Sequence, residues 1–81
     1  MFKIVIVKIK DHIKIRLAIA KTGRSLRGFS ETIGISHSYL SQILNGKHNP
    51  SPTIANKIAS GLQAEIEEFF LIKVVDAPTT R

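Results

Sequence analysis

Two short amphipathic segments, residues 26–33 (LRGFSETI) and 37–45 (HSYLSQILN), are separated by only three residues, which begin with Gly34. Apolar residues recur at helical spacing in both segments. Serine often caps the N-terminus of a helix, and one serine precedes each segment, at Ser25 and Ser36. Gly34 can adopt the positive φ that a tight turn requires. We therefore expect two helices joined by a sharp turn.

The second of these segments has one apolar and one polar side. Leu40, Ile43 and Leu44 form its apolar stripe, and the opposite side can hydrogen-bond but carries almost no charge. Ser30 supplies a small residue where the two helices would pack. A helix presented in this way fits the major groove of DNA, where side chains reach base edges. The polar side consists of His37, Ser38, Ser41, Gln42 and Asn45.

The sequence predicts a single, mainly α domain over residues 1–81. Its helical core is expected over residues 11–70 and contains five helices, two of which are those described above. The first helix follows Asp11 as its N-cap, the fourth follows Ser51, and the fifth lies around residues 64–70.

Both ends of the chain are rich in β-branched residues, which predicts short strands over residues 2–9 (FKIVIVKI) and 71–75 (LIKVV). Such strands are too short and too apolar to be stable alone in water. They pair within one chain, or with their counterparts across a two-fold axis, and the sequence leaves both arrangements open. We expect the C-terminal region to form a dimer interface through Phe69, Phe70, Leu71 and Val74.

Positive charge is concentrated in the first two thirds of the chain. Residues 1–57 carry a net charge of +8 and residues 58–81 a net charge of −2. This distribution suits a polyanionic partner, although a basic protein without such a partner would have the same composition. The chain contains no cysteine, which excludes disulfides and thiolate metal sites and fits a cytoplasmic location.

The apolar N-terminal run does not indicate a membrane or export segment. Lys3, Lys8 and Lys10 interrupt it, and no small-residue cleavage site follows. No run approaches the roughly 20 apolar residues that span a bilayer, so no membrane association is expected.

Residues 26–51 (LRGFSETIGISHSYLSQILNGKHNPS) resemble the phage-repressor (Cro/CI, XRE-like) class of helix-turn-helix DNA-binding proteins, and the similarity runs over about residues 13–70. The resemblance implies a five-helix lambda-repressor-like DNA-binding domain, usually dimeric, that binds palindromic operators to repress or regulate transcription. Its most specific pieces are Gly34-Ile35-Ser36, Tyr39-Leu40-Ser41, Gly46-Lys47 and Asn49-Pro50-Ser51.

The chain departs from the family pattern at two places within the helices. Members often begin the second helix with a glutamine that reaches a phosphate, but Leu26 stands there in this chain. Many also pair an arginine in the first helix with a glutamate at the end of the third, and here those positions are Ile19 and Leu44. Replacing both partners of a partly buried ion pair with apolar residues is often neutral or stabilising. We therefore expect Ile19 and Leu44 to touch.

The resemblance assigns DNA contacts residue by residue. The five polar residues of segment 37–45 are expected to contact bases, although Asn45 would equally serve as a helix C-terminal residue. Tyr39 either contacts phosphate or packs against the second helix. The residues expected to contact phosphates are Arg24, Ser25, Arg27, Ser36, Tyr39, Lys47 and His48.

The function predicted from these features is a sequence-specific transcriptional regulator, a repressor that binds palindromic double-stranded DNA as a homodimer through a recognition helix over residues 36–45. The alternative is an antitoxin or protein-interaction module that binds a partner, such as a toxin or an anti-repressor, through its terminal strands. No cofactor or metal is expected, because His12, His37 and His48 lack ligand spacing. No nucleophile–base arrangement stands out, so an enzyme is not expected.

Overall fold

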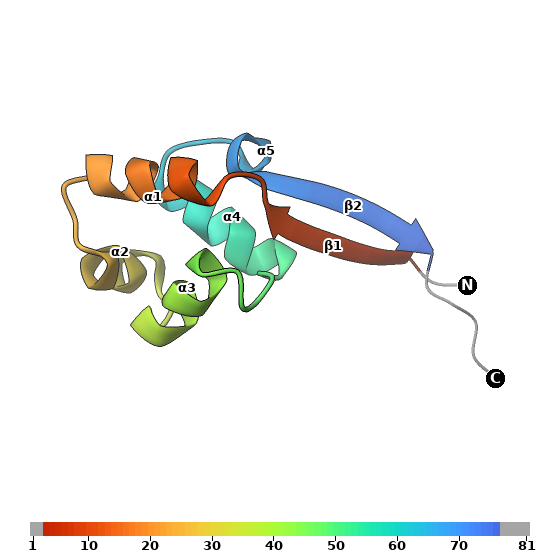
Figure 1. Ribbon diagram of the computed structural model, residues 1–81, viewed down its shortest axis with the longest axis horizontal. Helices are drawn as coiled ribbons and strands as arrows, with labels where there is room; N and C mark the ends of the chain where they lie inside the picture. The colour runs from red at the N-terminus through yellow and green to blue at the C-terminus, as the bar shows by residue number, and fades with distance from the viewer. Residues whose placement is uncertain (1–2, 77–81) are drawn as a thin grey trace.

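Five helices pack into one body, and a two-stranded antiparallel ribbon extends from it (Figure 1). This computed structural model describes residues 3–76. The predicted mainly α fold with terminal strands is confirmed. In chain order the elements are β1 (Lys3–Ile9), α1 (His12–Lys21), α2 (Leu26–Ile33), α3 (His37–Leu44), α4 (Pro52–Gly61), α5 (Ile66–Phe69) and β2 (Phe70–Asp76).

Polar caps set the start of the four longer helices. The Asp11 carboxylate accepts hydrogen bonds from the N–H groups of Ile13 and Lys14 at 3.0 and 3.1 Å. Ser51 caps α4 by accepting from the Ile54 N–H at 3.2 Å, with a proline at the start of the helix. These bonds satisfy amides that have no partner inside the helix, so the predicted helix starts are confirmed.

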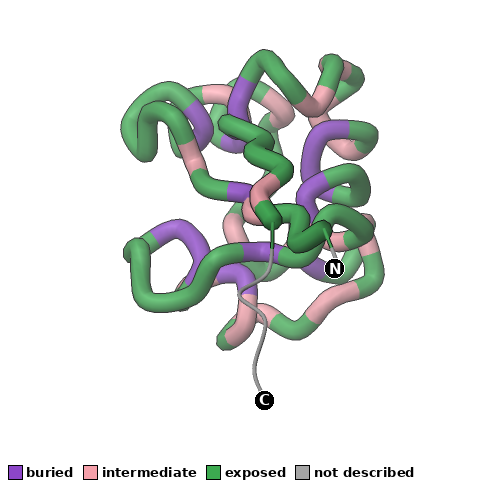
Figure 2. Tube along the Cα trace, turned by 90° about the vertical axis from the view of Figure 1, so that its right-hand side faces the viewer, coloured by how far each residue is buried: buried purple, intermediate pink, exposed green. Residues whose placement is uncertain are grey.

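Apolar side chains from every element meet between the helices, where the buried residues gather (Figure 2). Phe29 of α2, Leu40 of α3 and Ile58 of α4 are all 0% exposed. Ile19 and Leu44, expected to touch, both belong to this buried cluster and line one small hollow between α1 and α3. Helix α3 therefore packs mainly against α2, and Ile19 of α1 lies beside its Leu44.

Helix α4 approaches α2 closely at Gly61. A Cβ added at Gly61 would lie 2.5 Å from Cγ2 of Ile33 and 3.1 Å from the ring of Phe29. Both distances are shorter than ordinary van der Waals contact. The absence of a side chain at Gly61 therefore lets the two helices pack.

The last helix and strand differ slightly from the predicted boundaries. Helix α5 is a single turn, shorter than the predicted residues 64–70. Phe70, placed in the helical core by the sequence, has the extended backbone of a strand (φ −126°, ψ 144°) because it pairs with Ile9. Phe2, at the start of the predicted strand 2–9, lies outside the described residues.

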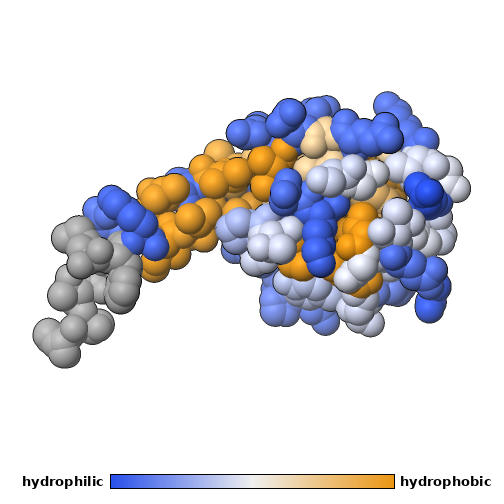
Figure 3. Space-filling model, turned by 180° about the vertical axis from the view of Figure 1, so that it is seen from behind, coloured by the Kyte–Doolittle hydropathy of each residue, from blue (hydrophilic) through white to orange (hydrophobic). Residues whose placement is uncertain are grey.

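Strands β1 and β2 pair with each other inside the chain, in a register that sets Val5 opposite Val74 and Ile9 opposite Phe70. One face of the ribbon near the helices is buried, since Val7 is 2% and Phe70 1% exposed. Beyond the body the ribbon presents an apolar surface that runs toward a hydrophilic tip (Figure 3). The terminal strands therefore cover part of the core and also leave a protruding apolar arm.

Candidate nucleic-acid interface

The turn between α2 and α3 is built on Gly34, whose backbone is left-handed (φ 78°, ψ 32°). The N–H of Gly34 donates to the carbonyl of Glu31, and the N–H of Ile35 donates to the carbonyl of Ser30 at 3.0 Å. These bonds satisfy carbonyls at the end of α2 that lack a helical partner. Ser30 is 1% exposed, which agrees with the small buried residue predicted at this position.

The two sides of α3 have opposite environments. Leu40, Ile43 and Leu44 are buried in the core, as their spacing predicts. The polar side of α3 is left facing outward, so it is accessible to a ligand the size of DNA. Of the five residues predicted to contact bases, three are exposed (Ser38, Gln42 and Asn45) and two are half-buried (His37 and Ser41).

The starts of α2 and α3 are both capped by serine. The hydroxyl oxygens of Ser25 and Ser36 accept from the N–H groups of Gly28 and Tyr39, each at 3.0 Å. The other N–H groups of a first helical turn have no intrahelical acceptor and carry partial positive charge. Helix starts of this kind bind phosphate oxygens readily.

Basic side chains flank the two helices on the outside of the body. Arg24 and Arg27 lie at the start of α2, and both are exposed. Lys47 and His48, also exposed, directly follow the end of α3, where the N–H of Lys47 donates to the carbonyl of Gln42 at 2.9 Å. These four residues therefore lie at both ends of the helix pair.

Tyr39, one of the residues predicted to contact phosphate, is half-buried on α3. Its ring centroid lies 6.1 Å from that of His48, and the two rings are tilted by 60°. This geometry is typical of a favourable edge-to-face aromatic contact. The tyrosine thus joins α3 to the loop that follows it.

Asn45 forms the C-cap of α3, and its side chain is already engaged. Its Oδ1 accepts a hydrogen bond from Nη2 of Arg16 in α1 at 2.7 Å, and its Nδ2 donates to Oγ of Ser41 at 3.5 Å. Sequence reasoning missed Arg16. The only signal in the sequence was its place one turn before Ile19. Ile19 itself stands where the family often has the arginine of an ion pair.

The four residues expected at a dimer interface lie in two different environments. Phe69 and Phe70 are 4% and 1% exposed and belong to the core of the single chain. Leu71 and Val74 are 48% and 60% exposed on the ribbon. Only the latter two are therefore on the surface of the monomer.

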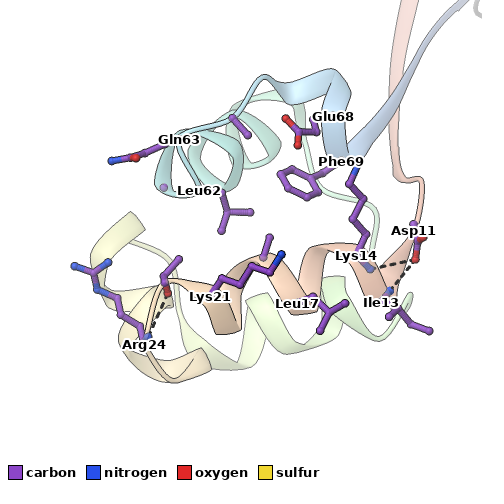
Figure 4. A pocket seen from close by; sticks show the side chains of 14 residues that line it. Asp11, Ile13, Lys14, Leu17, Lys21, Arg24, Leu62, Gln63, Glu68 and Phe69 are labelled. Carbon is purple, nitrogen blue, oxygen red and sulfur yellow. Dashed lines mark hydrogen bonds between the residues drawn. The ribbon is translucent and has the colours of Figure 1, made fainter.

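A broad, open hollow of about 770 Å³ lies between α1 and the α4–α5 region (Figure 4). Lys14 extends over the ring of Phe69, with its Nζ 5.6 Å from the ring centroid. The one hydroxyl group that lines the hollow, that of Thr22, donates to the carbonyl of Ile19 at 2.6 Å. The lining offers no pair of nucleophile and general base.

Across residues 3–76, no group of three or more histidine, cysteine, aspartate or glutamate side chains is placed so that it could hold a metal ion. Within the same range, no helix has both the length and the apolar character needed to cross a membrane.

Comparison with models of protein families gave a match to the model described as helix-turn-helix, over residues 15–69. The match begins in α1 and ends with α5, so it covers all five helices in whole or in part and more than half of the chain. The comparisons with curated proteins and with solved structures gave no match.

Proposed function

The chain belongs to the Cro/CI-like (XRE) helix-turn-helix family of DNA-binding regulators, and on that basis we propose that it is a sequence-specific repressor that binds palindromic operator DNA as a homodimer. The family is one of regulatory DNA-binding domains and not of enzymes. In this proposal each monomer places residues 36–45 in a major groove.

The observation that carries the proposal is the exposed polar side of α3. Gln42 is exposed one turn after Ser38, on the side opposite the buried leucines and isoleucine. A glutamine can bond to adenine through both N6 and N7, and serine can donate to or accept from any base. His37, at the start of the helix, can donate to a guanine acceptor. These side chains would supply selectivity.

Phosphate contacts would fix the position of α3 in the groove. The capped starts of α2 and α3 offer backbone N–H groups. Arg24, Arg27 and Lys47 offer positive charge on either side, and His48 offers a ring nitrogen. Such contacts contribute affinity but no base selectivity. We assign phosphate contacts to these four residues together with Ser25, Ser36 and Tyr39.

Asn45 has a different place in the proposal from the other polar residues of α3. Its Oδ1 accepts from Arg16, so a direct bond to a base would compete with a bond inside the protein. We propose that Asn45 supports the recognition helix from its C-terminal end and that base contact is concentrated on the residues from His37 to Gln42.

The proposed homodimer is supported by the ribbon. Ile4, Val5 and Val74 are 42%, 44% and 60% exposed, and contiguous apolar surface of this kind marks interaction sites. The same observation favours a second candidate function, in which the arm binds a different protein and the chain acts as an antitoxin or interaction module.

A comparison of two glutamine variants tests base readout. Gln42→Ala should weaken binding to the preferred duplex by about 1–3 kcal/mol and leave binding to an unrelated duplex unchanged. Gln63→Ala is the matched control, since Gln63 lies after α4 and outside the helix pair. Equal losses on both duplexes for Gln42→Ala would argue against readout by this residue.

A further inference from the structure

The distal half of the ribbon lacks a partner in the single chain. A two-stranded sheet has two open edges, each of which presents N–H and C=O groups that could pair with another strand. Two strands alone are marginally stable in water, and this pair keeps Ile4, Val5 and Val74 exposed at its far end. A further strand would satisfy one open edge and cover part of the apolar surface.

The two edges differ in charge. Lys73 stands in the middle of β2, between Ile72 and Val74, and lysine on an edge strand is a common protection against pairing. In β1 the lysines stand at positions 3 and 8, on either side of the uninterrupted apolar run Ile4–Val7. The open edge of β1 is therefore the better match for another apolar strand.

We infer that β1 pairs antiparallel with β1 of a second copy across a two-fold axis centred on Val5, which makes a four-stranded sheet in the order β2, β1, β1, β2. The inference rests on the proposed homodimer and specifies how it forms. A two-fold axis brings the same patch of both copies together, so the patch must be self-complementary.

The apolar run of β1 meets this requirement. With Val5 opposite its own counterpart, Ile4 lies opposite Ile6 and Lys3 opposite Val7, so no lysine faces another lysine. The same operation applied to β2 about Lys73 would set two lysines directly opposite each other, which is destabilising. Moving the two-fold axis by one residue, to Ile72 or Val74, would still set each Lys73 opposite an apolar residue, Leu71 or Val75.

This pairing also sets how far apart the two helical bodies lie. Ile9, where β1 joins the body, is four residues from Val5, so the two junctions would be about 27 Å apart at ~3.4 Å per residue. The bodies would lie beyond the two ends of the sheet. The two α3 helices would therefore be farther apart than the two junctions.

Disulfide trapping tests the pairing, and the chain is suited to it because it contains no cysteine. Residues directly opposite in an antiparallel pair have Cα atoms about 4.5–5.5 Å apart, within the range that a disulfide bridges. Full-length Val5→Cys should therefore form a covalent dimer under mild oxidation, at least tenfold faster than Val74→Cys. Val74 is the matched control because it lies opposite Val5 in the same ribbon and is more exposed.

A charge substitution provides an independent measurement. Val5→Lys would set two lysines opposite each other across the axis, so sedimentation should show a dimer dissociation constant raised at least tenfold. Val74→Lys should raise it much less. Three outcomes would each overturn the inference. Val74→Cys could link faster than Val5→Cys, or Val5→Cys could stay unlinked although the wild type is a dimer. The wild type could also remain a monomer at concentrations that saturate DNA.

The outcome separates this inference from the proposed function. If Gln42→Ala loses selectivity while Val5→Cys stays unlinked, base readout stands and the β1 pairing falls. If Val5→Cys links and Gln42→Ala has no effect on selectivity, the pairing stands and base readout by Gln42 falls.

Discussion

Arg16 of α1 donates a hydrogen bond from Nη2 to Oδ1 of Asn45 at 2.7 Å, which ties the first helix to the C-terminal end of α3. Ile19 and Leu44 stand at the positions where the family often pairs an arginine with a glutamate. The polar link between the two helices is thus retained, displaced by one turn along α1 and one residue along α3. Beside it, Ile19 and Leu44 are buried in the core.

This link should appear as an energetic coupling. A double-mutant cycle of Arg16→Met and Asn45→Ala, measured by denaturant unfolding, should give a coupling free energy of about 0.5–1 kcal/mol. This is less than is usual for a hydrogen bond to a charged group, because both side chains are exposed. Arg27→Met paired with Asn45→Ala is the control and should show additive effects. A coupling indistinguishable from zero in the first cycle would mean that the bond does not stabilise the fold.

Gly61→Ala should destabilise the protein. The added methyl group would lie 2.5 Å from Ile33 Cγ2, on a stiff β-branched side chain, and 3.1 Å from the fully buried ring of Phe29. Overpacking of this kind costs about 1–3 kcal/mol, which lowers the melting temperature of a domain of this size by several degrees.

Gly28→Ala provides the control for that experiment, because the nearest atom to its added Cβ is Ser25 Oγ at 3.4 Å. Within α2 this change should be neutral or stabilising by up to about 1 kcal/mol, since alanine is the better helix former. If Gly61→Ala melted at the wild-type temperature, the close approach of α4 to α2 would be contradicted.

Gln63→Gly should stabilise the protein. Gln63 is the one non-glycine residue with a positive φ (56°) among residues 3–76, in the position after α4 where helices commonly end on glycine. Relief of the left-handed conformation outweighs the extra flexibility of glycine in the unfolded chain by about 0.5–1 kcal/mol. Thermal melting should show a higher midpoint for Gln63→Gly but not for Gln63→Ala, which keeps the strain.

Lys47→Gln tests the phosphate assignments through salt dependence. Removing one phosphate contact should reduce the slope of log K against log salt by about 0.9, with the preferred base sequence unchanged. Lys14→Gln removes the same charge on the side of α1 that faces Phe69 and should leave the slope unaltered. Identical slopes for wild type and Lys47→Gln, from titrations between about 50 and 200 mM salt, would exclude Lys47 from the interface.

The features that the sequence predicted well depend on neighbouring residues. Asp11, Ser25, Ser36 and Ser51 each accept a hydrogen bond from an amide two or three residues later, so a short window of sequence contains the whole signal. The turn at Gly34 is equally local.

The features that the sequence did not predict depend on contacts between distant segments. Gly61 matters because α4 meets α2, and the bond between Arg16 and Asn45 spans 29 positions. Phe69 and Phe70 looked like interface residues because their apolar character suits either role. Their burial depends on contacts across the full length of the chain, since Phe70 pairs with Ile9 of β1 and the carbonyl of Phe69 accepts from the N–H of Lys10.

Selection of bound duplexes from a random pool is the decisive measurement, because it asks whether α3 reads bases as part of a symmetric dimer. We predict a palindromic consensus with half-sites about one helical turn apart, and Gln42→Ala should lose the preference at one position in each half-site. Selection that returns no consensus, with only salt-sensitive binding to all duplexes, would contradict base readout by α3.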